Sequence, residues 1–150
     1  MNSTATGPVL FAYDGSDLAK MAIAEAAGQL NHGREALVVT VWRPFAVGFV
    51  SPRELQINAA AANEVRAAAE QAAAQGAALA EAADFQARSM AVEAAPGWKG
   101  IVDAADDQDA SLIVLGSHGR TGLASVLIGS VAEAVAAHSR RSVLIVHRRA

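Results

Sequence analysis

The chain contains no cysteine and carries little net charge. Without cysteine it has no disulfide, no thiolate metal site and no cysteine nucleophile. The formal charge of -3 gives no sign of a surface for nucleic acid. No apolar run approaches the roughly 20 residues of a membrane helix, and the N-terminus lacks the basic start and apolar centre of a signal peptide. We therefore expect a cytoplasmic protein whose partners are neither membranes nor nucleic acids.

Two common nucleotide signatures are also missing. The sequence has no Walker lysine motif and no G-x-G-x-x-G for a dinucleotide. What it does have is the composition of a globular protein, with 53% apolar and 18% charged residues. A length of 150 residues suffices for one domain with a full core, and we expect residues 1–150 to form a single domain.

Short apolar runs alternate with helical patterns along the chain. The runs are typical of buried strands, and the segments between them carry helix-start residues, glycine ends or alanine-rich helix formers. The expected strands are residues 9–13, 36–42, 85–92, 111–115 and 142–147, and the expected helices are 17–30, 55 or 58 to 83, 97 onward, and 130–138. Residues 44–58 are expected to be irregular and are the candidate for a partner contact or a lid.

Strands that alternate with helices predict parallel pairing through right-handed crossovers. The sequence therefore predicts an α/β fold with one doubly wound, five-stranded parallel sheet in the order 3-2-1-4-5 and helices on both faces. Ligands bind such sheets beyond the C-terminal strand ends, where the winding reverses. The first and fourth strands meet there, and both end in turn signals, Asp14-Gly-Ser16 and Gly116-x-x-Gly119.

A glycine-rich segment joins the fourth strand to the last helix. Gly116 and Gly119 are three residues apart, and Gly129 follows ten residues later, just before Ser130. Backbone amides in such a connection can crowd around phosphate. We expect Gly119 to adopt a backbone angle that other residues resist, and Gly129 to let a bulky group approach. Arg120 would add a charged fork for phosphate.

Ser130 and Glu133 fit the capping-box pattern, in which each side chain accepts a hydrogen bond from the other residue's amide. The amides of Val131 and Ala132 would then point out of the helix start, where the helix dipole favours an anion. His118 lies in the same loop and could meet a phosphate, but an exposed loop histidine more often has no ligand. We therefore expect His118 to be idle.

These motifs resemble those of a known family. The spacing Gly116-x2-Gly119-x9-Gly129-Ser130 is similar to the ATP-binding motif of universal stress protein domains. Three further segments resemble the family's first strand and turn, its fourth strand and loop, and its last strand: residues 9–16, 110–123 and 142–146. The resemblance leaves out only about residues 44–65 and implies a Rossmann-like fold of the adenine nucleotide alpha hydrolase type.

The resemblance also implies roles for single residues. Asp14 is expected to contact the adenine end of the nucleotide, Val41 to offer backbone groups to adenine, and Gly116 to lie near the ribose. The phosphates, often with a divalent ion, are expected to be held by Gly119, Arg120, Gly129, Ser130 and Val131. The implied cofactor is ATP, with or without magnesium, and we expect no catalytic residue and no metal ligands from the protein.

The last expected strand, residues 142–147, is an edge strand in the predicted order and is apolar on both faces. Arginines flank it and are expected to guard the edge against uncontrolled pairing: Arg140, Arg141, Arg148 and Arg149. A second copy that pairs edge to edge would cover the apolar face, as is common in the family. We expect a homodimer through this strand.

Three functions remain open. The first is an ATP-binding module of the stress response that regulates an unidentified protein partner with little or no turnover, because no general base stands beside the glycine loop. The second is a slow ATPase or nucleotidyl-transfer enzyme on the same fold. The third is an interaction protein that binds no nucleotide, and the intact glycines argue against it.

Overall fold

The computed structural model describes residues 7–43, 52–119 and 128–148. In chain order its elements are β1 (Val9–Ala12), α1 (Asp17–Gln29), β2 (Glu35–Trp42), α2 (Pro52–Ala82), β3 (Gln86–Glu93), α3 (Gly97–Asp107), β4 (Leu112–Gly116), α4 (Ser130–His138) and β5 (Ser142–Val146). The bounds lie within one residue of those expected from the sequence, except at the start of α2.

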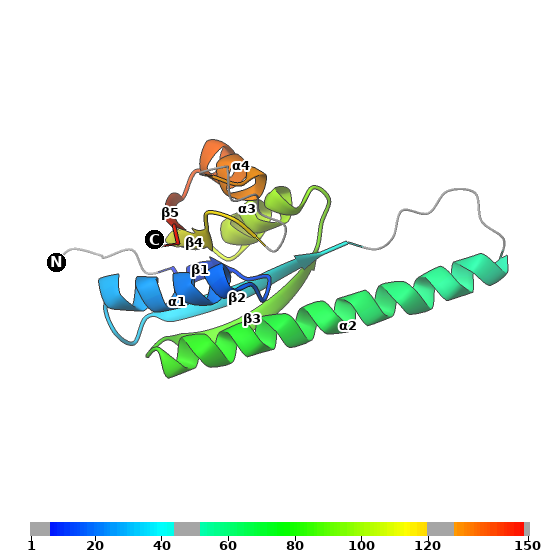
Figure 1. Ribbon diagram of the computed structural model, residues 1–150, viewed down its shortest axis with the longest axis horizontal. Coiled ribbons are helices and arrows are strands. Elements are labelled where there is room, and N and C mark those ends of the chain that lie inside the picture. The colour runs from blue at the N-terminus through cyan, green and yellow to red at the C-terminus, as the bar shows by residue number, and fades with distance from the viewer. Residues whose placement is uncertain (1–6, 44–51, 120–127, 149–150) are drawn as a thin grey trace.

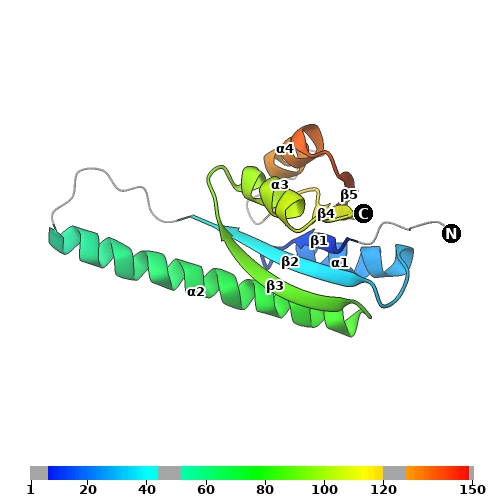
Figure 2. The same cartoon turned by 180° about the vertical axis from the view of Figure 1, so that it is seen from behind.

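The five strands form one parallel sheet in the order β3-β2-β1-β4-β5, as predicted. Helices α1 and α2 cover one face, and α3 and α4 cover the other (Figures 1 and 2). The chain therefore has the doubly wound α/β architecture, and its winding reverses between the neighbouring strands β1 and β4.

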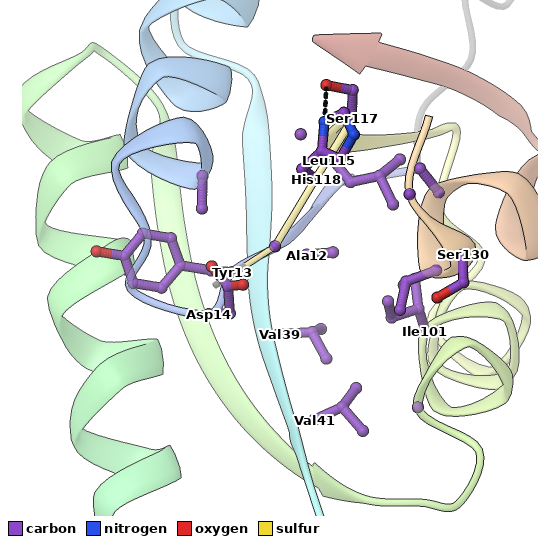
Figure 3. Close-up of a pocket in the computed structure, with 17 residues that line it drawn as sticks. Ala12, Tyr13, Asp14, Val39, Val41, Ile101, Leu115, Ser117, His118 and Ser130 are labelled. Carbon is purple, nitrogen blue, oxygen red and sulfur yellow. Dashed lines mark hydrogen bonds between the residues drawn. The ribbon is translucent and has the colours of Figure 1, made fainter. Parts of the chain in front are cut away.

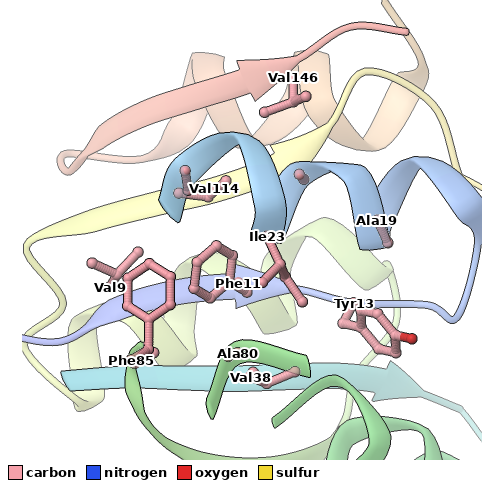
Figure 4. Packing of buried hydrophobic residues seen from close by; sticks show 13 residues of the cluster. Val9, Phe11, Tyr13, Ala19, Ile23, Val38, Ala80, Phe85, Val114 and Val146 are labelled. Atoms are coloured by element: carbon pink, nitrogen blue, oxygen red, sulfur yellow. The ribbon is translucent and has the colours of Figure 1, made fainter. Parts of the chain in front are cut away.

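Alternate side chains of β1 feed two separate cores. Val9 and Phe11 face α1 and α2, whereas Leu10 belongs to the cluster beneath α3 and α4. Phe11 meets Phe85 edge to face, with ring centroids 5.2 Å apart. In Figure 4 both rings and the side chain of Ile23 from α1 lie in the core on this face of the sheet. Because both faces of the sheet are packed, the strand ends are left as the place for a ligand.

Helix α2 begins earlier than expected. Its first residue is Pro52, so residues 52–58 are helical and not irregular; proline is favoured at the first helical position. Within residues 59–82, α2 is buried against the sheet through Ala69, Ala73 and Ala80. The earlier part of the helix extends past the sheet (Figure 1). The expected lid or partner segment, residues 44–58, otherwise lies outside the described residues.

No described helix has both the length and the apolar character needed to cross a bilayer.

The apolar side chains of β5 are covered more fully than the sequence predicted. Leu144 packs partly against the core under α1 and α2, while Val143 and Ile145 pack partly against the core under α3 and α4. Both faces are thus partly covered within the chain, and among the described strands β5 pairs with β4 alone. The open feature of β5 is its backbone edge, not an apolar face.

Arg141 does not guard that edge. Its guanidinium lies 3.2 Å from an Asp106 carboxylate oxygen and 2.9 Å from one of Asp109, and it donates to the Ala110 carbonyl. The hydrogen bond to Asp109 and then the one to Asp106 raise the pKa of Arg141 above its ordinary value. The side chain therefore ties the start of β5 to the turn that follows α3.

Candidate functional site

A pocket of about 490 Å³ opens at the C-terminal edge of the sheet. Its walls come from the ends of β1, β2 and β4 and from the first turns of α1, α3 and α4 (Figure 3). This is the winding-reversal point between β1 and β4, where doubly wound folds bind their ligands. The volume is that of a small-molecule site.

The structure brings the predicted site residues together. Seven of the eight line this pocket: Asp14, Val41, Gly116, Gly119, Gly129, Ser130 and Val131. The eighth, Arg120, lies outside the described residues. Residues more than a hundred positions apart in the sequence thus share one cavity.

The turn after β1 places Asp14 beside the glycine loop. Asp14 Oδ1 accepts a hydrogen bond from the Ser16 amide at 2.9 Å, and Gly15 between them has φ +81°, which favours glycine. Ser16 caps α1 as predicted, since its hydroxyl accepts from the Ala19 amide at 3.2 Å. A Cβ on Gly119 would lie 2.8 Å from Asp14 Oδ2. The carboxylate expected at the adenine end therefore also borders the phosphate loop.

The reason expected for Gly119 was wrong. Its φ is not in the left-handed region, where the described glycines are Gly15 and Gly33. A Cβ at Gly119 would crowd the Asp14 carboxylate, so a side chain there would require that carboxylate to move.

One backbone hydrogen bond closes the glycine loop. The Gly129 amide donates to the Ser117 carbonyl at 2.6 Å, and the Ser117 amide donates to the Val146 carbonyl of β5 at 2.8 Å. A Cβ on Gly129 would lie 3.0 Å from the same Ser117 oxygen. The two ends of the motif are therefore held together at the mouth of the pocket.

The capping box at α4 does not form. The N-cap is Gly129, not Ser130, and no side chain caps it. The Glu133 amide donates to the Gly129 carbonyl at 3.0 Å as the first helical hydrogen bond. The amides of Ser130, Val131 and Ala132 precede that bond and have no acceptor within the helix. All three residues line the pocket, and the helix start has one more open amide than a capping box at Ser130 would leave.

Val41 presents its backbone to the pocket. The Tyr13 amide donates to the Val39 carbonyl at 2.9 Å, so the backbone groups of Val39 point toward β1. The register of β1 ends at Ala12 opposite Val39. Two residues on, the groups of Val41 point the same way, past the end of β1. The backbone role that the family resemblance implies for Val41 stays a prediction.

Tyr13 was not expected in the site, because it looked like the last apolar residue of a strand. The residue lines the pocket, but its side chain packs in the core under α1 and α2 and points away from the pocket (Figure 3). Its hydroxyl donates to Gln75 Oε1 of α2 at 3.3 Å. Burial and then the Asp14 carboxylate raise the pKa of the Tyr13 phenol. The phenol therefore stays protonated at neutral pH and links the pocket to α2.

His118 was expected to be an idle, exposed loop residue, yet its ring is half-buried in the pocket wall. Nδ1 lies 3.1 Å from Ser117 Oγ (Figure 3), and Nε2 is buried without a hydrogen-bond partner. Nothing in the local sequence revealed this, since the burial depends on Gly129 folding back over Ser117.

Comparison with known proteins gives a family. The model of the universal stress protein family matches residues 6–147. No curated protein matches the sequence.

Three solved structures illustrate the likeness. The hypothetical protein MJ0577 is 24% identical with a TM-score of 0.78, over 97% of this chain and 99% of that one. The universal stress protein UspA from Lactobacillus plantarum is 21% identical with a TM-score of 0.76, over 96% and 99%. A universal stress protein solved in complex with cAMP is 26% identical with a TM-score of 0.62, over 96% and 98%.

Proposed function

Because the chain belongs to the universal stress protein family, we propose that it binds an adenine nucleotide, ATP above all, in the pocket beyond β1 and β4. We further propose that it acts as a regulatory module of the stress response with little or no turnover. The observation that carries the proposal is the set of three open amides at the start of α4.

The phosphates are assigned to that helix start. The amides of Ser130, Val131 and Ala132 lack helical acceptors and line the pocket, and the helix dipole adds about 0.3–1 kcal/mol of attraction for an anion at an exposed site. Gly119 and Gly129 leave room that a Cβ would fill. Arg120 would bring a positive charge to the same end.

The adenine is assigned to the apolar part of the pocket near the end of β2. Val39 of β2 and Ala12 of β1 line the pocket, and the backbone groups of Val41 point past the end of β1. A flat apolar slot with a few fixed backbone partners suits a purine base. The cAMP bound to one similar protein supports an adenine nucleotide as the class of ligand.

Magnesium would arrive with the phosphates. Within the described ranges no three histidine, aspartate or glutamate side chains gather where they could hold a metal. Asp14, beside Gly119, is the nearest carboxylate to the phosphate end that lines the pocket. Calorimetric titration of ATP with and without magnesium tests this assignment and the proposed function together. Absence of binding under both conditions would favour an interaction protein that needs no nucleotide.

One feature of the pocket favours the alternative of an ATP-hydrolysing or nucleotidyl-transfer enzyme. Asp14 and His118 are both titratable side chains in the pocket wall, and Asp14 lies closer to the glycine loop than expected. One oxygen of Asp14 already accepts from the Ser16 amide, and Glu133 is exposed on α4 and does not line the pocket. Among the residues that the structure describes, no group is thus placed clearly as a base for an attacking water.

On prolonged incubation with ATP and magnesium we expect stoichiometric binding without product. The measurement is chromatographic analysis of the nucleotide, together with an assay for inorganic phosphate. Release of phosphate or AMP at many turnovers per site would replace the regulatory reading with the enzyme reading, and Asp14→Asn would then show whether that carboxylate is responsible.

We expect a homodimer joined through the open edge of β5. Residues 142–146 pair with β4 on one side, and their other backbone edge has no neighbour among the described strands, so a second β5 can continue the sheet. Multi-angle light scattering at micromolar concentration should give twice the mass of the 15.4 kDa chain. A mass of one chain would contradict the dimer.

A further inference from the structure

His118 holds a ring nitrogen that the structure leaves unpaired. Nε2 is closed to solvent and has no hydrogen-bond partner among the described residues. A buried polar nitrogen without a partner is unfavourable, and the few in native proteins often mark functional sites. The other ring nitrogen is engaged, because Nδ1 lies 3.1 Å from the Ser117 hydroxyl oxygen.

The ring lies at the phosphate end of the pocket. A Cβ on Gly129 would lie 3.6 Å from His118 Cδ2, the ring atom bonded to Nε2. Gly129 is the N-cap of α4, directly before the three open amides. When the Ser117 hydroxyl donates to Nδ1, the neutral ring carries its proton on Nε2 and offers a donor there. A phosphate bound to the three amides would thus lie near the Nε2–H donor of His118.

We propose that His118 is a phosphate ligand that turns its side chain into the pocket when a nucleotide binds. The proposal rests on the nucleotide site proposed above. In the structure the ring is held by Ser117 while Nε2 is unpaired. Turning about the Cα–Cβ bond gives up the one hydrogen bond to Ser117 and gains one to a phosphate oxygen. A bond to a charged acceptor is about twice as strong as a neutral one, so the exchange favours the nucleotide-bound form.

The Ser117 hydroxyl then opposes nucleotide binding, because it holds the His118 ring in the resting position. This effect distinguishes a phosphate ligand from a histidine that only stabilises the fold. Its side chain is 2% exposed and its backbone hydrogen bonds do not involve the hydroxyl. Ser117→Ala removes the bond that holds the resting ring and leaves those backbone bonds intact. Freeing the ring lowers the cost of reaching the competent conformation. We expect Ser117→Ala to bind ATP about two- to tenfold more tightly than the unmodified protein.

The experiment is calorimetric titration of the full chain and three variants with ATP and with adenosine, which has no phosphate. We expect His118→Leu to bind ATP about tenfold more weakly and adenosine unchanged. His118→Gln, which keeps a donor near the position of Nε2, should retain most of the ATP affinity. The imidazole ¹⁵N signals of His118 should move on addition of ATP but not of adenosine.

The proposal is overturned if His118→Leu binds ATP as tightly as the unmodified protein, or loses the same factor for ATP and adenosine. It is also overturned if Ser117→Ala weakens ATP binding. Should His118→Leu unfold, as thermal unfolding would reveal, Ser117→Ala and the imidazole signals decide. Failure of the unmodified protein to bind either compound would instead remove the proposed function on which this inference rests.

Discussion

Replacing Ser130 with proline is expected to weaken ATP binding by roughly ten- to a hundredfold while α4 stays folded. The substitution deletes one of the three open amides, and losing a hydrogen bond to a charged group costs about 1.5–3 kcal/mol. Proline is favoured at the first helical position. Gly129 before it has φ -73° and ψ 165°, which is the conformation that a residue before proline adopts. Calorimetric titration with ATP gives the change in affinity.

Ser130→Ala is the matched control, because it removes the hydroxyl and keeps the amide. We expect it to retain ATP affinity within a few-fold, since the hydroxyl caps no helix in the structure. If both variants lost affinity equally, the side chain and not the main chain would hold the phosphates. If neither lost any, the phosphates would lie elsewhere.

Gly129→Val is expected to abolish ATP binding at millimolar nucleotide. Its Cβ would lie 3.0 Å from the Ser117 carbonyl oxygen and 3.5 Å from His118 Cα, and both of these are backbone atoms. The Cβ and the branched methyl groups beyond it would push these backbone atoms apart, which strains the 2.6 Å bond from the Gly129 amide and shifts the start of α4. The backbone angles themselves suit valine, so the effect comes from crowding and not from strain.

Gly28→Val serves as the control for adding a valine to this protein. Gly28 lies in α1, and a Cβ there meets nothing within 4 Å. We expect that variant to bind ATP as the unmodified protein does, with thermal unfolding as the check on folding. Retained ATP binding by Gly129→Val would show that the phosphates do not depend on the closed loop.

The sheet could be predicted from the sequence because its signals are local and repeated. Each apolar run, such as residues 142–146, is followed or preceded by a helix signal, and alternation of this kind leaves few topologies. The same logic placed Asp14 and Gly119 at one edge of the sheet. In the structure the two residues are neighbours, since a Cβ added to Gly119 would lie 2.8 Å from Asp14 Oδ2.

The cap of α4 could not be predicted because the sequence fits two registers. Ser130 and Glu133 satisfy the capping-box spacing, but the N-cap of α4 is Gly129, one residue before Ser130. Gly129 is pinned to the Ser117 carbonyl, and its own carbonyl takes the Glu133 amide. A tertiary contact between two loop ends therefore overrides a local preference.

Tyr13 was overlooked as a pocket residue, and His118 was expected to be idle and exposed, for a related reason. Their surroundings depend on partners far along the chain: Gln75 for Tyr13, and for His118 the return of Gly129 to Ser117. The start of α2 is different, because Pro52 was a usable sign of a first helical position that the irregular composition around it obscured.

The central claim is that main-chain donors ahead of α4 seat the polyphosphate. A crystal structure grown with excess ATP and magnesium tests it most directly. We expect phosphate oxygens within about 2.7–3.2 Å of the amide nitrogens of Ser130, Val131 and Ala132. A structure in which ATP is bound but its phosphates avoid all three nitrogens would contradict it.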